Sequence, residues 1–229
     1  MQLFNFNLKF FKRRMKIPIA WKATIIVSII IIIDQILKIW IKTNMYIGQS
    51  FPIFGEWSFI YFVENPGMAF GLEFGGKTGK MLLSIFRILA IGAFVWYIRE
   101  LIRQKAPQGF IVCVSLILAG AIGNTIDCIF YGMIFDSGTT FNTELGAYVS
   151  YSGVSQFSTN GYASILHGSV VDMFYFPIIN TTYPDWFPFK AGESFIFFRP
   201  IFNIADSAVT TGVFSIFIFY WKYLKEAGK

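Results

Sequence analysis

The stretch AWKATIIVSIIIIIDQILKIWI, residues 20–41, decides the fold class of this chain of 229 residues. It is apolar over about 20 residues, the length at which a helix crosses a bilayer core of about 30 Å. Lipid offers no partner to free backbone N–H and C=O groups, so a spanning segment of this kind is helical. A cleaved signal peptide is shorter and ends in a small-x-small site, which does not follow here. The stretch therefore predicts a retained membrane-spanning helix.

Three later stretches have a similar length and apolar character. Together with the first they predict a mainly α-helical integral membrane protein, a bundle of four transmembrane helices that forms a single membrane domain over residues 1–229. The segments between the spans are then two long loops, residues 42–80 and 131–201. The three stretches are residues 81–98, 110–130 and 202–221, and their only charged residues are Arg87, Asp127 and Asp206, respectively.

Composition favours a lipid-facing surface. Apolar residues make up 55% of the chain and charged residues 14%, with a mean hydropathy of +0.57, whereas soluble domains carry about 25% charged residues. A net charge of +6 could suit a nucleic-acid binder, but here the charges lie between apolar runs instead of along one polar face. The sequence therefore argues against a soluble enzyme and against nucleic acid as a partner.

The basic residues predict the orientation. Most of them lie before or at the start of the first span, between the second and third, and after the fourth: Lys9, Lys12, Arg13, Arg14, Lys16, Lys22, Arg99, Arg103, Lys105, Lys222, Lys225 and Lys229. The positive-inside rule puts these segments in the cytoplasm. Both termini are then cytoplasmic, and the two long loops lie outside. These loops are aromatic: residues 57–63 predict a short strand, and residues 183–189 suit the membrane–water interface.

Three carboxylates fall inside the predicted spans, namely Asp34, Asp127 and Asp206. An ionisable group in a transmembrane helix is costly, so each is a candidate functional residue. Asn124 precedes Asp127 by three positions, and Asn203 precedes Asp206 by three, which puts each amide and carboxyl on one helix face. Because consecutive spans are antiparallel, the two Asn-x-x-Asp faces come to a similar depth near the outer side. They predict a site of paired carboxylates.

Paired carboxylates point to proton chemistry, because two that lie close together cannot both ionise cheaply and one keeps a proton. The ionised member can take a proton from water while the other donates to a carbonyl, as in aspartic proteases. Structural hydrogen bonds between helices, or a proton or cation path in a small proton-coupled carrier or channel, stay open as alternatives. Asp34 and Lys38, four residues apart, predict an internal ion pair.

Five short blocks span residues 34–207, and their order, together with the four-span layout, resembles the lipoprotein signal peptidases, the type II signal peptidases of bacteria. The blocks are DQILK (34–38), ENPGMAFG (64–71), GAIGNTID (120–127), GSVVDMF (168–174) and FNIADS (202–207). The resemblance implies an intramembrane aspartyl endopeptidase of the bacterial cytoplasmic (inner) membrane, with its active site near the outer face.

The resemblance also implies the reaction partners. The substrate is a prolipoprotein that carries a diacylglyceryl group on its lipobox cysteine, and cleavage falls just before that cysteine. Membrane lipid is the other partner, no metal or other cofactor is required, and a monomer is expected. By position, the resemblance assigns Asp127 and Asp206 to the catalytic dyad.

Supporting roles follow from the same blocks. Asn124 and Asn203 match polar residues that line the dyad, and Asn65 matches an outer-loop asparagine near the substrate. Asp172 matches an acidic residue with a structural or lining role. The pair Asp34 and Lys38 matches a first-span motif that supports the site. The family layout further implies a small extracytoplasmic β-sheet cradle after the first span and a flexible lid before the fourth.

Two departures from the family stand out. Cys128 occupies a position where the family often has arginine, so the contribution of that arginine must come from elsewhere or be dispensable. The outer insertion, residues 133–166, is longer than the family's minimal form, and the sequence assigns it no role.

Overall fold

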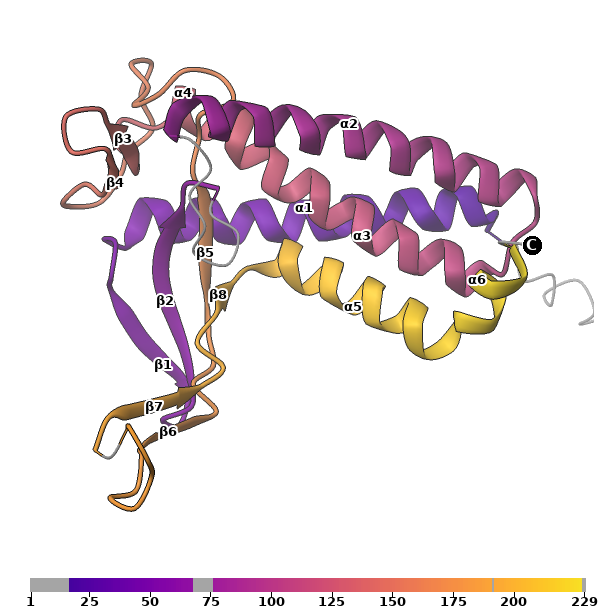
Figure 1. The fold of residues 1–229 in the computed structure, drawn as a ribbon. Coiled ribbons are helices and arrows are strands. Elements are labelled where there is room, and N and C mark those ends of the chain that lie inside the picture. Colours follow the sequence, from indigo (N-terminus) through magenta and orange to yellow (C-terminus); the bar gives the residue numbers. More distant parts are fainter. Residues whose placement is uncertain (1–16, 68–75, 191, 228–229) are drawn as a thin grey trace, which may run out of the picture.

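The computed structural model describes residues 17–67, 76–190 and 192–227. In this part of the chain, helices pack side by side and short strands gather at one end of them (Figure 1). The helices are α1 (Ile19–Asn44), α2 (Gly76–Arg103), α3 (Gln108–Ile126) and α5 (Ile204–Phe219). A π-helical turn η2 (Asp127–Tyr131) and the short α4 (Gly132–Ile134) prolong α3, and α6 (Trp221–Ala227) follows α5.

Among the described residues, three helical segments are long and apolar enough to cross a membrane: α1, α2 and the run from Gln108 to Ile134. They overlap the stretches predicted at 20–41, 81–98 and 110–130. The fourth predicted stretch contains α5, which has 16 residues and is therefore about 24 Å long at 1.5 Å per residue. The structure is thus a membrane protein with three long apolar helices, and the count of four spans stays a prediction.

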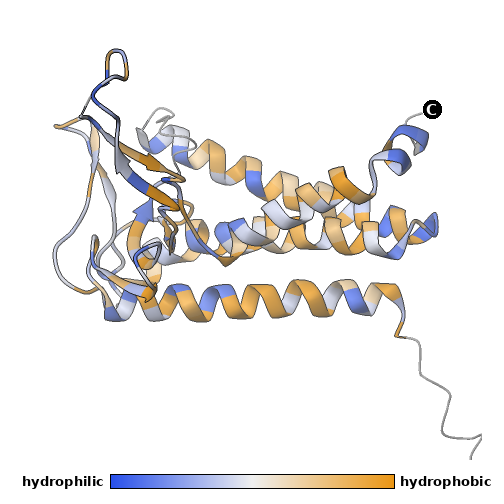
Figure 2. Ribbon diagram, turned by 90° about the horizontal axis from the view of Figure 1, so that it is seen from below, coloured by the Kyte–Doolittle hydropathy of each residue, from blue (hydrophilic) through white to orange (hydrophobic). Residues whose placement is uncertain are grey.

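The first helix has its apolar and polar faces reversed relative to a soluble protein. Ile29, Ile33 and Ile36 are at least half exposed, whereas the side chains of Asp34 and Lys38 are fully buried. Figure 2 shows that hydrophobic residues predominate along the helices. In water, burial would favour the isoleucines and exclude the charges. The surface of α1 therefore suits lipid, and its polar residues serve contacts inside the bundle.

The third helix is the centre of the bundle and packs against α1, α2 and α5. Small residues permit the helix backbones to approach closely. A Cβ added to Gly120 would collide with the Ala205 carbonyl oxygen, and one added to Gly212 would lie 2.6 Å from the Cys113 carbonyl oxygen. Close backbone approach through glycine is the usual device for helix pairs in membranes. It brings the start of α5 against the end of α3, where the polar residues lie.

An antiparallel sheet covers the end of the bundle, in the order β1 (Ser50–Phe54), β2 (Ser58–Asn65), β5 (Val170–Tyr175) and β8 (Ile201–Phe202). The predicted strand 57–63 corresponds to β2, whose alternate residues are buried. Phe62 and Met173 from the sheet pack with Tyr131 and Phe135 below it. Two hairpins complete this end: β3 (Thr140–Asn142) with β4 (Ala147–Val149), and β6 (Ile179–Thr182) with β7 (Ser194–Phe197).

The strands and hairpins lie together at one end of the bundle, while the α2–α3 connection and α6 lie at the other (Figure 1). This separation agrees with two loops on one side of a membrane. The β6–β7 hairpin, which falls in the segment expected to form a lid, lies near the β1–β2 turn, away from the helices (Figure 1). Trp186 and Phe189, between its strands, are 79% and 100% exposed. The lid therefore stays a prediction. The N-terminal basic residues and residues 68–71 of the second block lie outside the described residues.

Candidate active site

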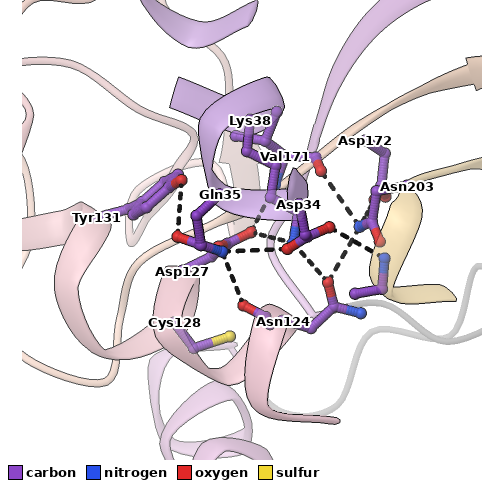
Figure 3. A network of polar contacts seen from close by, with 12 residues as sticks. Asp34, Gln35, Lys38, Asn124, Asp127, Cys128, Tyr131, Val171, Asp172 and Asn203 are labelled. Carbon is purple, nitrogen blue, oxygen red and sulfur yellow. Dashed lines mark hydrogen bonds and ion pairs between the residues drawn. The ribbon is translucent and has the colours of Figure 1, made fainter. Parts of the chain in front are cut away.

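Asp127 lies in the π-helical turn at the end of α3 and is fully buried. Its Oδ2 atom lies 2.8 Å from Lys38 Nζ and accepts the Val171 backbone N–H at 3.3 Å. Its Oδ1 atom accepts a hydrogen bond from Gln35 Nε2 at 2.9 Å. A buried carboxylate with this set of donors is compensated and held in place. Figure 3 shows these side chains converging between α1 and the end of α3.

Lys38 is the hub of this group, and its side chain is fully buried. Besides Asp127, its ammonium lies 2.9 Å from Asp34 Oδ2 and donates to Asn124 Oδ1 at 2.8 Å. Asp34 Oδ1 in turn accepts the backbone N–H of Ala205, at the start of α5, at 3.0 Å. The ion pair predicted between Asp34 and Lys38 is therefore present. It ties α1 to α3 and α5, which is a positioning role.

Asp206 lies in the first turn of α5 and is partly exposed. It forms a capping box with Asn203: the Asn203 side chain accepts the Asp206 N–H at 2.9 Å, and Asp206 Oδ2 accepts the Asn203 N–H at 3.2 Å. The other oxygen, Oδ1, accepts from Asn124 Nδ2 at 2.8 Å. None of the ion pairs in the described part of the chain includes Asp206. Amides, not cations, hold this carboxylate.

Asp172 lies on β5, opposite Val63 of β2, and is 4% exposed. Its Oδ1 atom accepts a hydrogen bond from Asn203 Nδ2 at 2.6 Å. Burial, and to a smaller degree the nearby Asp206 carboxylate, raise the pKa of the Asp172 carboxyl well above its usual range. Asn203 therefore contacts both aspartates, and these two carboxyl groups influence each other electrostatically.

The sequence predicted that Asp127 faces Asp206. The contacts of the described residues connect those two only indirectly, through Lys38 and Asn124. Asp172, to which the sequence gave a structural or lining role, has the closer link to Asp206. The reason lies in strand pairing: Phe174 of β5 pairs with Phe202 of β8, directly before α5. That register was not visible in the sequence.

Asn124 and Asn203 each contact Asp206, and their role in lining a catalytic dyad stays a prediction. Asn65 ends β2 opposite Val170, and its side-chain oxygen accepts the Gly67 N–H at 2.9 Å, which stabilises the turn after the strand. Its substrate contact stays a prediction. Sequence analysis missed Gln35, which contacts both Asp34 and Asp127. Its place inside the DQILK block was the available signal.

Cys128, which replaces the family's arginine, accepts a hydrogen bond from Arg87 Nη1 of α2 at 3.1 Å. A guanidinium therefore reaches this position from a neighbouring helix. Within residues 17–67, 76–190 and 192–227, no three His, Cys, Asp or Glu side chains form a group that could hold a metal ion. The independence from metal stays a prediction that rests on the aspartates.

Long apolar helices, with a cluster of aspartates where they meet a small sheet, define a membrane protein with a polar candidate site. Residues 26–222 match the family model described as signal peptidase (SPase) II. The chain is 42% identical over 208 residues to the lipoprotein signal peptidase of Porphyromonas gingivalis, a match that covers 90% of this chain and 85% of that one. It is 36% identical over 197 residues to the lipoprotein signal peptidase of Amoebophilus asiaticus, covering 85% and 75%.

The fold also matches solved structures. A bacterial membrane enzyme determined by the in meso method superimposes with a TM-score of 0.52 and 27% identity, covering 86% of this chain and 91% of that one. This protein therefore belongs to the signal peptidase II family. It is a bacterial membrane protease.

Proposed function

We propose that this protein removes signal peptides from lipid-modified prolipoproteins with Asp172 and Asp206 as its catalytic pair. The removal of signal peptides from lipoproteins follows from membership of the family. The choice of aspartates rests on one observation: Asn203 contacts both Asp172 and Asp206, whereas Asp127 is neutralised by Lys38. This replaces the Asp127–Asp206 dyad that the sequence analysis predicted.

The two carboxyl groups divide the chemistry. Asp206 is partly exposed and takes the proton of the attacking water, whose oxygen bonds to the carbonyl carbon of the scissile peptide. Asp172 has a raised pKa, keeps its proton, and donates it to the carbonyl oxygen in the tetrahedral intermediate. As the C–N bond breaks, the proton on Asp206 passes to the leaving nitrogen. Asp172 then recovers its own proton as the carbonyl re-forms.

Lys38 and the side chains that it contacts act on this catalytic pair indirectly. Lys38 holds the Asn124 side-chain oxygen, so the Asn124 amide nitrogen is directed at Asp206. Asp34 Oδ1 accepts the backbone N–H of Ala205 in the first turn of α5. Both contacts position Asp206 without touching the substrate. Asp127 serves the same group as the second counter-charge of Lys38.

The membrane setting completes the proposal. The four helices α1, α2, α3 and α5 cross the cytoplasmic membrane, both termini face the cytoplasm, and the sheet forms a cradle at the outer face. Support comes from Lys22, Arg99, Arg103 and Lys105 at the opposite end of the bundle. The diacylglyceryl group of the substrate stays in the outer leaflet and sets the cleavage position just before the modified cysteine. A monomer suffices for this site, because one chain supplies all the residues named.

A cleavage assay tests the function. The purified protein in detergent is mixed with a diacylglyceryl-modified prolipoprotein and, separately, with the same precursor lacking the lipid, and the product is followed by a gel shift. We expect cleavage of the modified precursor alone, and its loss in Asp172→Asn and Asp206→Asn. Cleavage of both precursors at equal rates would remove the lipid requirement. A folded wild-type protein without cleavage would return the carrier alternative, which proton flux in liposomes would test.

A further inference from the structure

A cavity lies between the start of α2 and the insertion, apart from the aspartates. It has a volume of about 410 Å³. The β3–β4 hairpin forms one wall, because the Tyr148 hydroxyl donates to the Gly76 carbonyl at 3.2 Å and the Phe141 ring packs against Gly76. Gly76 has φ +58°, a conformation that favours glycine. The lining residues are Lys77, Lys80, Thr140, Phe141, Tyr148, Tyr162, Ala163, Ser164 and His167.

Lys80 is the unusual member of this lining, since it is only 6% exposed. Its ammonium donates to Ser169 Oγ at 3.1 Å and lies 5.5 Å from the centre of the Tyr148 ring. The ion pairs of the described chain do not include it. A buried ammonium without a counter-charge is costly. Lys42, by contrast, is fully buried and pairs with Glu64. Among the described residues, the Lys80 ammonium therefore has no ion-pair partner of its own.

The rest of the lining suits an anion. Lys77 lies one turn before Lys80, on the exposed side, and the described residues that line the cavity include no aspartate or glutamate. Both lysines belong to the first turns of α2, where the helix dipole favours negative charge. Thr140, Ser164 and Tyr162 add hydroxyl groups. The Tyr162 oxygen accepts the Ser169 N–H at 2.8 Å.

We infer that this cavity binds a phosphate group, most favourably the headgroup phosphate of an anionic membrane lipid. Two ammonium groups and several hydroxyls match the charge and the oxygens of a phosphate, and the Phe141 and Tyr148 rings give an apolar wall for the attached glycerol and chain. In the proposed orientation, on which the choice of lipid rests, the cavity opens at the outer leaflet. The insertion 133–166 thereby acquires a role in lipid binding.

Calorimetric titration of the purified protein in neutral detergent tests this inference. The probes are dioctanoyl phosphatidic acid, dioctanoylglycerol, which lacks the phosphate, and inorganic phosphate. Lys77→Gln and Lys80→Gln remove the two charges one at a time. Lys190→Gln, on the β6–β7 hairpin, is the matched control. We expect saturable binding of the phosphatidic acid, weakened about tenfold or more in either cavity variant and unchanged in the control. Dioctanoylglycerol shows no dependence on either lysine.

Two outcomes would overturn the inference: no saturable binding to the wild type, or equal affinity in both cavity variants and the wild type. Inorganic phosphate that binds as tightly as the lipid would keep the phosphate site and assign it to the free anion. If Lys80→Gln fails to fold, the exposed Lys77 carries the test alone. Because the titration does not use cleavage, it stands whether or not the assignment of the catalytic pair survives.

Discussion

Asp127 and Asp206 both follow an Asn-x-x-Asp pattern at a helix end, yet their surroundings are opposite. Around Asp127 the donors are an ammonium, an amide and a backbone N–H, and the side chain is fully buried. Around Asp206 the donors are one side-chain amide and one backbone N–H, and the carboxyl is partly exposed. A buried aspartate, Asp172, is its electrostatic neighbour.

This difference distinguishes a carboxylate that is held in place from carboxyl groups that can take part in proton transfer. A carboxylate paired with a buried cation stays ionised and fixed, because protonation would leave the cation uncompensated. Two carboxyl groups joined by amides can exchange protons, because neither forms an ion pair among the described residues. In the proposed mechanism, these aspartates therefore have distinct roles, and a direct ion pair with Lys38 is the feature that distinguishes Asp127.

The largest expected effect contrasts two isosteric changes. Asp172→Asn should lower kcat/KM at least about 10⁴-fold, as the removal of a catalytic group does, with little change in melting temperature. Asp127→Asn should instead reduce the free energy of unfolding by about 3 kcal/mol, with activity per folded molecule within about 100-fold of wild type. Thermal melting and single-turnover cleavage measure both. If the Asp172→Asn variant is active while the Asp127→Asn variant is folded but inactive, the catalytic pair is Asp127 and Asp206 instead.

Removing the cation should cost stability directly. Lys38→Met leaves Asp34 and Asp127 buried without a counter-charge, and we expect the free energy of unfolding to fall by about 3–5 kcal/mol. The matched control is Lys22→Met at the other end of α1, whose ammonium contacts only the Gln108 side chain in the described residues, at 3.3 Å. Equal denaturation midpoints for the two variants would show that the buried network does not hold the bundle together.

Removal of the Asn203 side chain, which contacts both Asp172 and Asp206, should slow the reaction. Asn203→Ala removes the side chain that contacts Asp172 and caps α5, so we expect a fall in kcat of about 10²-fold and about 1 kcal/mol less stability from the lost cap. Asn180→Ala, on the exposed strand β6, is the control and should leave both quantities unchanged. A purely structural role for Asn203 would lower stability without changing kcat.

The smallest effect concerns pH. The pKa of Asp172 is higher in the folded chain than its ordinary value near 3.9. Its contribution to stability is fully present below that ordinary value and is lost as the pH rises through the folded value. The loss is about 1.4 kcal/mol for each pH unit that separates the folded pKa from the unfolded one. Asp172→Asn should therefore lose less stability than wild type as the pH rises. Parallel curves of melting temperature against pH would contradict the raised pKa.

Local pattern in the sequence accounts for much of this molecule. Four apolar stretches located the main helices to within a few residues, and a run of aromatic residues located β2. The spacing of Asp34 and Lys38 anticipated their ion pair. What could not be anticipated was the partner of Asp206, because it depends on β5 pairing with β8 across the segment from Phe176 to Pro200. The approach of Arg87 to Cys128 likewise required the packing of α2 on α3.

By itself, the sequence determined that this chain is a membrane protein of the signal peptidase II family with aspartates near one end of its helices. The lengths of apolar stretches and the short motifs are local properties of the sequence, so they can be recognised without a structure. Only the tertiary structure decided which carboxyl groups share a site. Lys38 neutralises Asp34 and Asp127 because α1 packs against α3, and Asn203 joins Asp172 to Asp206 because a strand pair brings β5 to the start of α5. These contacts join residues that are far apart in the sequence, so a local pattern does not reveal them. In the low dielectric of the protein interior, one misplaced charge is costly.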